Sequence, residues 1–599
     1  MNKKLYLFLL CWMTGAVLPA RAQWVTEKLQ LKAGWNAVFL HVDASHATLD
    51  EVVGASAPVL TPIEQVWRWN ANPSTVQFVQ SPQQPLDAGS QWASWHRSGP
   101  GAVTLSRLTA NAAYLVYSTA DYTWELKGKP VAPDYRWSTT GLNFFGFPTQ
   151  EPVAPTFEGF LADVPSLQFS EIYRYPGGEL SASNPARVFA LRTTRVQRGS
   201  AYWIRAGEVF NNYFGPFDLT AAGGGQVEFG SSQGSYSFRL RNRTAGPLTV
   251  TLALLASENP PSGQRAILGT PPLLVRGEVN TTTLTYGLST LSAGGTKTWD
   301  LAAAGEVGSE VEVVLGLDRA AITTAPGQLL AGVLRLTDSL GQTRIDLSVS
   351  GEAASSSGLW VGSAAVTHVG QYLPVYQRGN DSALVVQTNG SYVVSSVDTN
   401  LTAVPTPFPL RLIVHNPAAG TATLMQRVYV GLNAATNVVV ANSESALAPA
   451  LLGTARRLTA THLPWSEANS GWNLSGLLSL DVPVTASVTN RFDSHESNPF
   501  LHTYHPDHDN LNSRFLSQLP QGSESFTIVR ELTLIPRVPA DDFNSRIAAN
   551  QQFIGDYLET LRVIGLARAG GTNDTRRFES RGIFQLNRVS EVSTLTRTP

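Results

Sequence analysis

Histidines and carboxylates gather in one short segment of this chain, residues 493–510. Four of the ten histidines lie there, interleaved with four acidic residues. Neutral imidazole and carboxylate oxygen are ligands that Zn²⁺ and related divalent ions accept in proteins. The segment is therefore the first candidate for chemistry. Its histidines and acids are Asp493, His495, Glu496, His502, His505, Asp507, His508 and Asp509.

The spacing of three of these histidines bears on how the chain presents them. His502, His505 and His508 follow one another at intervals of three, a spacing that lines one face of a helix. Pro506 and the neighbouring Asn and Asp residues disfavour a helix, so we expect a loop. In a loop the three imidazole rings can converge on one ion.

Three interpretations of the segment stay open. In the first, Zn²⁺ binds the histidines with Asp507 and Asp509, or Ca²⁺ binds Asp507, Asp509 and the Asn510 carbonyl. In the second, the polar groups cap turns in a purely structural loop. In the third, a histidine and a carboxylate act as general acid and base. The predicted metal ligands are His502, His505, Asp507, His508 and Asp509.

Tryptophans form a second candidate site, because exposed aromatic rings can stack on sugar rings. Trp67 and Trp69 are two positions apart and share one face of a predicted strand, as a core or a cross-strand ladder requires. Trp92 and Trp95 lie in a predicted loop, residues 83–101, and we expect their rings to be exposed. These two are the candidate ligand platform.

Familiar catalytic motifs do not support an enzyme. The chain contains no H-E-x-x-H, P-loop, G-x-G-x-x-G or EF-hand pattern. Residues 230–234 match G-x-S-x-G, but a strand pattern follows them where the hydrolase elbow requires a helix. We therefore predict a plain turn there. Paired acids of the glycosidase type are recognised only in a fold, so spacing leaves them open.

The first 22 residues have the pattern of a secretory signal peptide. Two lysines precede an apolar run, residues 5–17, which is too short to span a bilayer. A small-x-small cleavage site ends at Ala22, so we expect export and a mature chain that begins at Gln23. The single cysteine, Cys11, lies in the segment removed. Disulfides within the mature chain and thiolate metal sites are therefore excluded.

Composition points to many short antiparallel strands. Charged residues make up only 15% of the 599 residues, while 50 glycines and 36 prolines supply turns. The 43 basic residues are balanced by 45 acidic ones without any basic stripe, which argues against nucleic acid as a partner. No later segment is long and apolar enough for a membrane span. The predicted class is all-β, with serial β-sandwich or β-barrel-like domains.

Two segments near the start share landmarks, which predicts an N-terminal tandem duplication. The first has Gly34-Trp-Asn, then Trp67-Arg-Trp, then Ala113-Tyr; the second has Gly141-Leu-Asn, then Tyr173-Arg-Tyr, then Ala201-Tyr-Trp. This pattern resembles a β-module of exported bacterial proteins with an opening "GWN" and a closing "GYW". The resemblance covers about residues 23–219 and implies no catalytic residues.

Two further resemblances follow along the chain. The segment "SFRLRNRTAGPLTVTL" resembles abnormal-spindle-like immunoglobulin domains, which implies a spacer or binding module. Further on, "LRLIVH", "LPW", "NPF", "HTYHPDHDN" and "GIFQLNR" resemble, in that order, the C-terminal region of very large exported proteins of planctomycete and verrucomicrobial type. That resemblance implies kinship without an activity.

Five regions are predicted in all. They are a signal peptide at 1–22, β-module copies at 23–135 and 136–220, an immunoglobulin-like sandwich at 226–352, and a C-terminal β-rich domain at 358–599. We expect an exported, non-catalytic protein for extracellular structure, adhesion, or glycan or protein binding. The alternative is a metal-dependent extracellular hydrolase centred on residues 493–510, and a divalent metal, Ca²⁺ or Zn²⁺, is the cofactor it implies.

Overall fold

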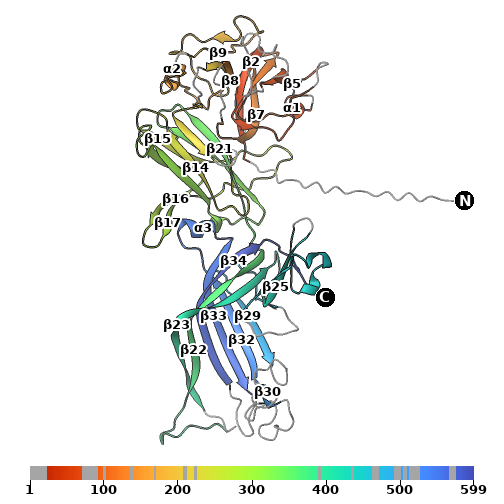
Figure 1. Ribbon diagram of the computed structural model, residues 1–599, viewed down its shortest axis with the longest axis vertical. Helices are drawn as coiled ribbons and strands as arrows, with labels where there is room; N and C mark the ends of the chain where they lie inside the picture. Colours follow the sequence, from red (N-terminus) through yellow and green to blue (C-terminus); the bar gives the residue numbers. More distant parts are fainter. Residues whose placement is uncertain are drawn as a thin grey trace, which may run out of the picture. The chain divides into compact units, whose positions relative to one another are not determined.

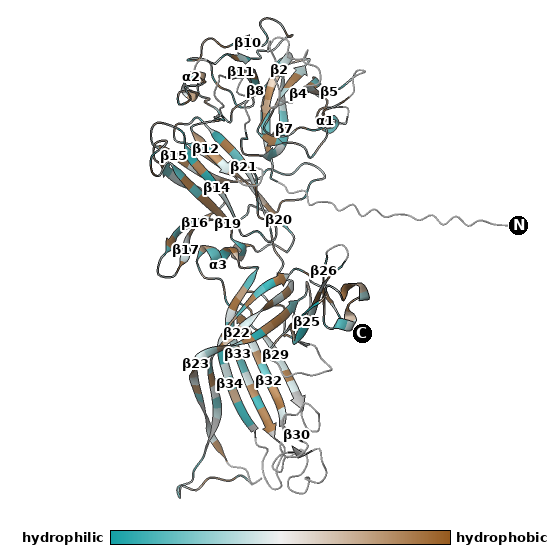
Figure 2. Cartoon of the chain, viewed as in Figure 1, coloured by the Kyte–Doolittle hydropathy of each residue, from teal (hydrophilic) through white to brown (hydrophobic). Residues whose placement is uncertain are grey.

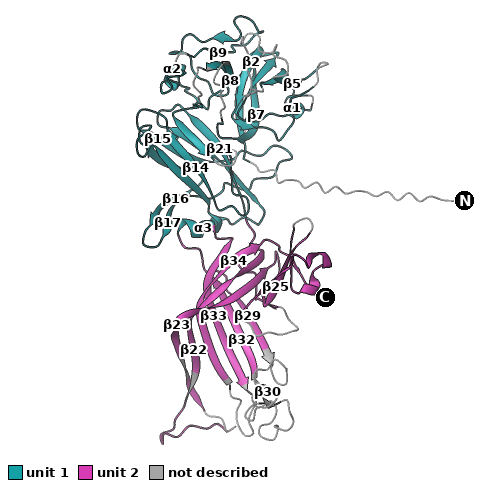
Figure 3. Ribbon diagram, in the orientation of Figure 1, with its two compact units in different colours: residues 1–353, 542–547 teal, residues 354–541, 548–599 magenta. Residues whose placement is uncertain are grey.

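The chain folds into two compact units (Figures 1 and 3). Unit 1 comprises residues 1–353 with 542–547, and unit 2 comprises residues 354–541 with 548–599. The computed structural model describes residues 23–54, 56–57, 59–69, 92–98, 103–134, 141–167, 170–206, 212–221, 225–388, 393–433, 437–461, 471–491, 501–502, 509–510, 526–565 and 575–598. Strands dominate both units, which confirms the all-β class.

The first predicted copy forms two layers at the start of unit 1. A four-stranded sheet has the order β2-β6-β4-β5, and a three-stranded sheet has the order β1-β7-β3. Strand β2 is buried at every position because both of its faces are covered. The strands are β1 (Val25–Leu31), β2 (Gly34–Leu40), β3 (Val42–Asp43), β4 (Ile63–Trp69), β5 (Trp92–His96), β6 (Ala112–Ser118) and β7 (Tyr122–Pro130), with helix α1 (Leu49–Val52) between β3 and β4.

The second predicted copy has the same strand order as the main sheet of the first, β8-β11-β9-β10. The pairing register agrees as well. Asn36 pairs with Val116 in the first sheet, and Asn143 pairs with Ile204 at the equivalent position in the second. The two segments therefore share one topology. The second contains β8 (Gly141–Phe145), α2 (Phe157–Phe160), β9 (Ile172–Arg174), β10 (Ala186–Arg187) and β11 (Tyr202–Ala206).

A tyrosine closes each copy in the same way. The Tyr114 hydroxyl accepts a hydrogen bond from the Thr109 amide at 2.9 Å, and the Tyr202 hydroxyl accepts one from the Gln197 amide at 2.9 Å. Each bond spans five residues and ties the turn to the strand that follows it. Both rings are almost fully buried, so a hydroxyl without this partner would be an unsatisfied buried group.

A β-sandwich of two five-stranded sheets completes unit 1. The sheet orders are β12-β14-β19-β16-β17 and β13-β21-β20-β15-β18. Strand β14 directly follows the turn at residues 230–234 and shows the alternating burial that its sequence predicts. The strands are β12 (Phe217–Ala221), β13 (Val227–Glu228), β14 (Ser235–Asn242), β15 (Leu248–Ala256), β16 (Leu273–Asn280), β17 (Thr285–Leu291), β18 (Thr296–Leu301), β19 (Glu310–Leu317), β20 (Leu329–Asp338) and β21 (Arg344–Glu352).

The observed boundaries differ from the predicted ones in two places. Strand β12 pairs with β14 and so belongs to the sandwich, although the second copy was predicted to extend to residue 220. Helix α3 (Phe543–Ile547) belongs to unit 1, although it falls inside the predicted domain 358–599. Its Phe543 is buried against Leu274 and Val314, and its Arg546 forms an ion pair with Asp318. Tertiary packing determines both assignments, and local patterns do not report it.

One hydrophobic core joins the three modules of unit 1. It contains inward side chains of β2 and β6, of the second copy, and of both sandwich sheets. At its centre the Trp203 ring stacks on Phe144 at 4.3 Å and meets Trp69 edge-on at 5.6 Å. The Trp203 indole N–H also donates to the Tyr175 hydroxyl at 2.8 Å. Trp67 and Trp69 pack against this core, as one interpretation of their shared strand face predicts. The modules form one unit because they share this core.

Unit 2 is built on one eight-stranded sheet of order β28-β24-β23-β22-β34-β33-β32-β29. A four-stranded sheet, β27-β25-β26-β35, also belongs to this unit, and its core residues cluster with Leu359 of β22 and Ile413 of β23. The segment 553–566, whose spacing fitted helix and strand equally, lies largely in strand β33. Figure 2 shows the alternation of polar and apolar residues along these strands.

The main sheet of unit 2 combines long strands, such as β22 with 19 residues and β23 with 23, with the three-residue strands β24 and β28. The strands of unit 2 are β22 (Gly358–Tyr376), β23 (Val394–Asn416), β24 (Thr423–Met425), β25 (Arg427–Leu432), β26 (Val438–Ala441), β27 (Arg456–Thr459), β28 (Gly471–Asn473), β29 (Val484–Arg491), β30 (Leu501–His502), β31 (Asp509–Asn510), β32 (Phe526–Pro536), β33 (Gln552–Gly565), β34 (Thr575–Ser590) and β35 (Leu595–Thr596). The core of the main sheet includes Trp360 and Phe553, whose ring centroids lie 4.4 Å apart.

Replacing Trp203 tests the central role of the shared core. Trp203→Ala removes a fully buried ring, and a cavity of this kind costs about 3–5 kcal/mol of unfolding free energy. We expect the urea midpoint for unfolding of unit 1, measured by tryptophan fluorescence, to fall accordingly. Phe189→Ala removes a ring that is 81% exposed and should change stability by less than about 0.5 kcal/mol. Equal effects of the two variants would contradict the assignment.

Candidate ligand cleft in unit 1

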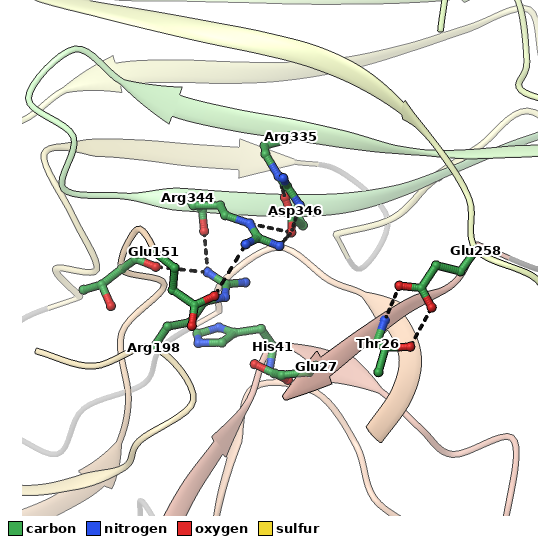
Figure 4. Close-up of polar contacts among 10 residues, drawn as sticks. Thr26, Glu27, His41, Glu151, Arg198, Glu258, Arg335, Arg344 and Asp346 are labelled. Atoms are coloured by element: carbon green, nitrogen blue, oxygen red, sulfur yellow. Dashed lines mark hydrogen bonds and ion pairs between the residues drawn. The ribbon is translucent and has the colours of Figure 1, made fainter. Parts of the chain in front are cut away.

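A cleft of about 910 Å³ opens where the three modules of unit 1 meet. One wall is strand β1, and the opposite wall is formed by residues 174–176 and 195–202 of the second copy. Arg344 and Asp346 of strand β21 line it from the sandwich (Figure 4). Beside the cleft, Glu258 accepts hydrogen bonds from the Thr26 amide at 2.9 Å and hydroxyl at 2.5 Å, which fixes β1 to the sandwich.

An arginine–aspartate network forms the sandwich side of this cleft. Asp346 is 4% exposed and accepts hydrogen bonds from Arg335 Nε at 2.7 Å and from Arg344 Nη2 at 2.7 Å. Burial opposes ionisation of this carboxyl, but the bond from Arg335 and the charges of Arg198 and Arg344 lower its pKa to about 2. Asp346 is therefore ionised at neutral pH and neutralised by its own partners.

Glu27 is a buried carboxyl on the β1 wall. It occupies the inward face of β1 together with Leu29 and Leu31, where the alternation calls for an apolar residue. Its Oε2 accepts a hydrogen bond from the His41 amide at 3.1 Å, and its Oε1 has no hydrogen-bond partner among the described residues. Burial raises the pKa of Glu27 to about 7, against the opposing charge of Arg198.

His41 lies next to Glu27 and is also buried, at 5% exposure. Burial and the nearby positive charge of Arg198 hold the pKa of His41 well below its usual range. The imidazole is therefore neutral at physiological pH, and its edge-on contact with the Phe39 ring, at 5.0 Å between centroids, suits an uncharged ring. Glu27 thus lines the cleft beside a neutral imidazole.

The wall from the second copy presents arginines. Arg198 donates Nη1 hydrogen bonds to the carbonyl oxygens of Arg344 at 2.7 Å and Thr149 at 3.4 Å. Arg195 donates to the Ala154 carbonyl, and Arg174 lies on the same wall. The cleft thus presents hydrogen-bond donors and positive charge from side chains that are tied to the backbone. Such groups can bind a polar ligand. None of these residues was predicted as a site residue. The sequence does carry one sign of the site, because Glu27 stands at a strand position where the alternation calls for an apolar residue.

The two predicted platform residues are buried, so the expectation that they are exposed is wrong. Trp92 is 7% exposed and Trp95 is 1% exposed. Both lie on strand β5, which pairs with β4, and their spacing of three places them on opposite faces of the sheet. Trp92 joins the core shared with the second copy, while Trp95 packs under β1 and β7 and donates its indole N–H to Asp50 at 2.9 Å.

The structure describes only part of the predicted metal segment. Strands β30 and β31 pair in parallel, which places the backbone of His502 beside Asn510 and that of Asp509 beside Leu501. His505, Asp507 and His508 lie outside the described residues. Within the described residues no group of three or more His, Cys, Asp or Glu side chains could hold a metal ion. The metal interpretation of residues 493–510 stays a prediction.

Metal analysis of the purified full chain tests that prediction. If residues 493–510 hold Zn²⁺ or Ca²⁺, elemental analysis should find stoichiometric metal, and EDTA should lower the melting temperature because the ion binds only the folded state. His505→Ala should abolish both the metal content and the effect of EDTA. Protein without metal, whose melting curve is unchanged by EDTA, would remove both the cofactor and the hydrolase alternative.

Comparison with known proteins adds no relative to this picture. No protein-family model matches the chain, and no curated protein matches it. The longest helix in the described part of the chain has five residues, and none there is long and apolar enough to cross a membrane. The fold and the cleft therefore define an all-β protein of two compact units with a charged cleft in the first.

The raised pKa of Glu27 makes the stability of unit 1 depend on pH. Its pKa is about 7 in the folded state against an ordinary 4.5, so folding is favoured while Glu27 is protonated. This contribution is complete below pH 4.5 and is lost as pH rises to 7. Glu27→Gln should remove this pH-dependent contribution. The unfolding free energy of the variant minus that of wild type should therefore rise by about 3 kcal/mol between pH 4.5 and 8.

The control for this titration is Glu306→Gln, at an exposed turn of the sandwich. It should follow the wild-type profile across the whole pH range. Urea unfolding monitored by tryptophan fluorescence supplies the free energies. A Glu27→Gln profile parallel to that of wild type would show that Glu27 does not titrate in this window.

Proposed function

We propose that the protein is an exported, non-catalytic β-protein of the cell surface or extracellular space that binds a glycan in the cleft of unit 1. The cleft itself is the observation that carries the proposal. Its volume of about 910 Å³ falls within the range of roughly 300–1,000 Å³ typical of small-molecule sites. The signal-peptide pattern of residues 1–22 supports export.

The lining of the cleft suits a sugar better than an apolar ligand. Sugars present hydroxyls around the ring and apolar C–H faces above and below it. The cleft offers arginine and glutamine donors beside the surfaces of Tyr175, Pro152 and Pro176. Charged and aromatic groups of this kind fix the orientation of a bound ligand, while the walls exclude water.

The walls are rigid because each belongs to an element that is packed into a hydrophobic core of unit 1. Strand β1 pairs with β7 along seven residues and buries Leu29 and Leu31, and the opposite wall leads into β11 through the turn that Tyr202 closes. In a binding site preformed in this way, the entropic cost of ordering the protein when a ligand binds is small. The architecture therefore supports recognition by a fixed surface.

A glycan array with the full chain tests the proposal, and Gln197→Trp provides the critical variant. Gln197 is exposed and lines the cleft, so an indole there should occupy the space that a sugar needs. We expect wild type to bind a defined subset of glycans and Gln197→Trp to lose at least about tenfold in affinity, or roughly 1.4 kcal/mol. Glu306→Trp, which adds the same ring away from the cleft, should bind as wild type does.

Two results would count against a glycan site in the cleft. Uniform background across the array would remove glycan binding as the function, and a protein partner of the same surface would then be sought. Selective binding that survives Gln197→Trp would place the glycan elsewhere on the chain. Near-identical melting curves of wild type and Gln197→Trp would establish that the variant is folded.

A further inference from the structure

We propose that the cleft selects glycans that carry oxyanions, either uronic-acid carboxylates or sulfate esters, and that Arg174, Arg195 and Arg198 bind these groups. This inference rests on the proposed glycan site and names its ligand class. All three arginines come from the second copy and line the same cleft. Among the described residues, none of them has a carboxylate within ion-pair distance.

Hydrogen bonding leaves most donors of these guanidinium groups available. A guanidinium carries five N–H donors in a planar fork. Arg198 uses Nη1 for two backbone carbonyls, and Arg195 uses Nη1 for one. Arg174 is exposed at the end of strand β9 and pairs with Ala186 through its backbone, while its guanidinium has no hydrogen-bond partner among the described residues. The remaining N–H groups match the geometry of carboxylate and sulfate oxygens, which they bind in pairs.

The acidic side chains of the cleft do not cancel this charge. Asp346 is already paired with Arg335 and Arg344, and Glu151 lies 3.6 Å from Arg344. The two lysines at the rim are balanced by partners on neighbouring elements, Lys28 by Glu125 at 2.9 Å and Lys32 by Asp121 at 2.8 Å. The unpaired positive charge therefore belongs to the three arginines.

Arg198 is held where its charge acts most strongly. Two backbone carbonyls fix its Nη1, and the charges of Asp346 and Glu27 act on its guanidinium (Figure 4). Burial lowers the pKa of Arg198, and the charges of Asp346 and Glu27 oppose that effect. A guanidinium keeps its proton in proteins, so the group stays charged. A charge in partly desolvated surroundings attracts an anion more strongly than one in water.

Glu27 gives this site a pH dependence. The charged and titratable groups that face it are His41, Arg198, Arg344 and Glu151. Because the pKa of Glu27 is about 7 and His41 stays neutral, the pair is uncharged in mild acid, and Glu27 gains a negative charge in mild alkali. An anionic ligand should therefore bind more weakly at pH 8 than at pH 6, and Glu27→Gln should reduce that difference.

Calorimetry with the full chain and matched oligosaccharides tests the ligand class. The probes are an oligouronate, the same oligomer as its methyl ester, a sulfated oligosaccharide and a neutral one of equal length. We expect the oligouronate or the sulfated oligomer to bind at least about tenfold more tightly than the neutral pair, with affinity falling as salt is added. Which anion binds more tightly distinguishes the two sources of the oxyanion.

Variants at exposed arginines keep the test independent of folding. Arg174→Gln and Arg195→Gln both replace exposed residues, and each should lower affinity for the anionic oligomer about threefold to tenfold. Arg192→Gln is the matched control, because Arg192 lies in the same segment, pairs with Glu158 and does not line the cleft. It should bind as wild type does. Arg198→Lys keeps a positive charge at this position but loses the planar set of N–H donors that can bind two oxyanion oxygens at once.

The outcomes separate this inference from the proposed function. Equal affinity for the oligouronate and its methyl ester, unchanged by Arg174→Gln and Arg195→Gln, would overturn the oxyanion inference and leave the glycan site intact. Absence of binding to all four oligosaccharides in the calorimeter, together with a flat array, would overturn the glycan site itself. If Arg192→Gln weakens binding of the anions as much as Arg174→Gln does, the anions respond only to diffuse surface charge. That result would also overturn the inference.

Discussion

The shared hydrophobic core of unit 1 is the constraint on which its other features depend. Trp203, Phe144 and Trp92 pack where the sheets of the two copies meet, and the same core continues into the sandwich. Three modules that bury their faces against one another cannot rotate independently. The walls of the cleft therefore keep a fixed separation, although they come from segments more than 100 residues apart in the chain.

Periodicity was informative wherever a strand has one face in the core. The alternation around Phe238 and Leu240 predicted β14, and the repeated landmarks placed Asn36 and Asn143 at positions that turn out to be equivalent in register. The prediction of a loop at residues 83–101 is wrong at β5. This segment contains strand β5, whose pairing with β4 buries both Trp92 and Trp95, and a short strand beside Gly and Pro residues carries little signal of its own.

The cleft could not have been read from local pattern, because its groups meet only through tertiary structure. Glu27 contacts His41 from 14 positions away, and Arg198 bonds to a carbonyl 146 positions away. Each residue alone resembles an ordinary surface charge. Glu27 differs in one respect, its place between apolar neighbours on the inward face of β1, and a charge at such a position marks a buried polar site.

Helix α3 ties the completion of unit 1 to the order in which the chain is made. Residues 542–547 cover Leu274 and Val314, and their Arg546 pairs with Asp318, which is 3% exposed. A growing chain that has produced the whole sandwich still lacks this partner until nearly all of the sequence has emerged. During that interval the Asp318 carboxylate and the apolar patch of Leu274 and Val314 remain exposed to water. Unit 1 therefore reaches its final form only after much of unit 2 has been synthesised.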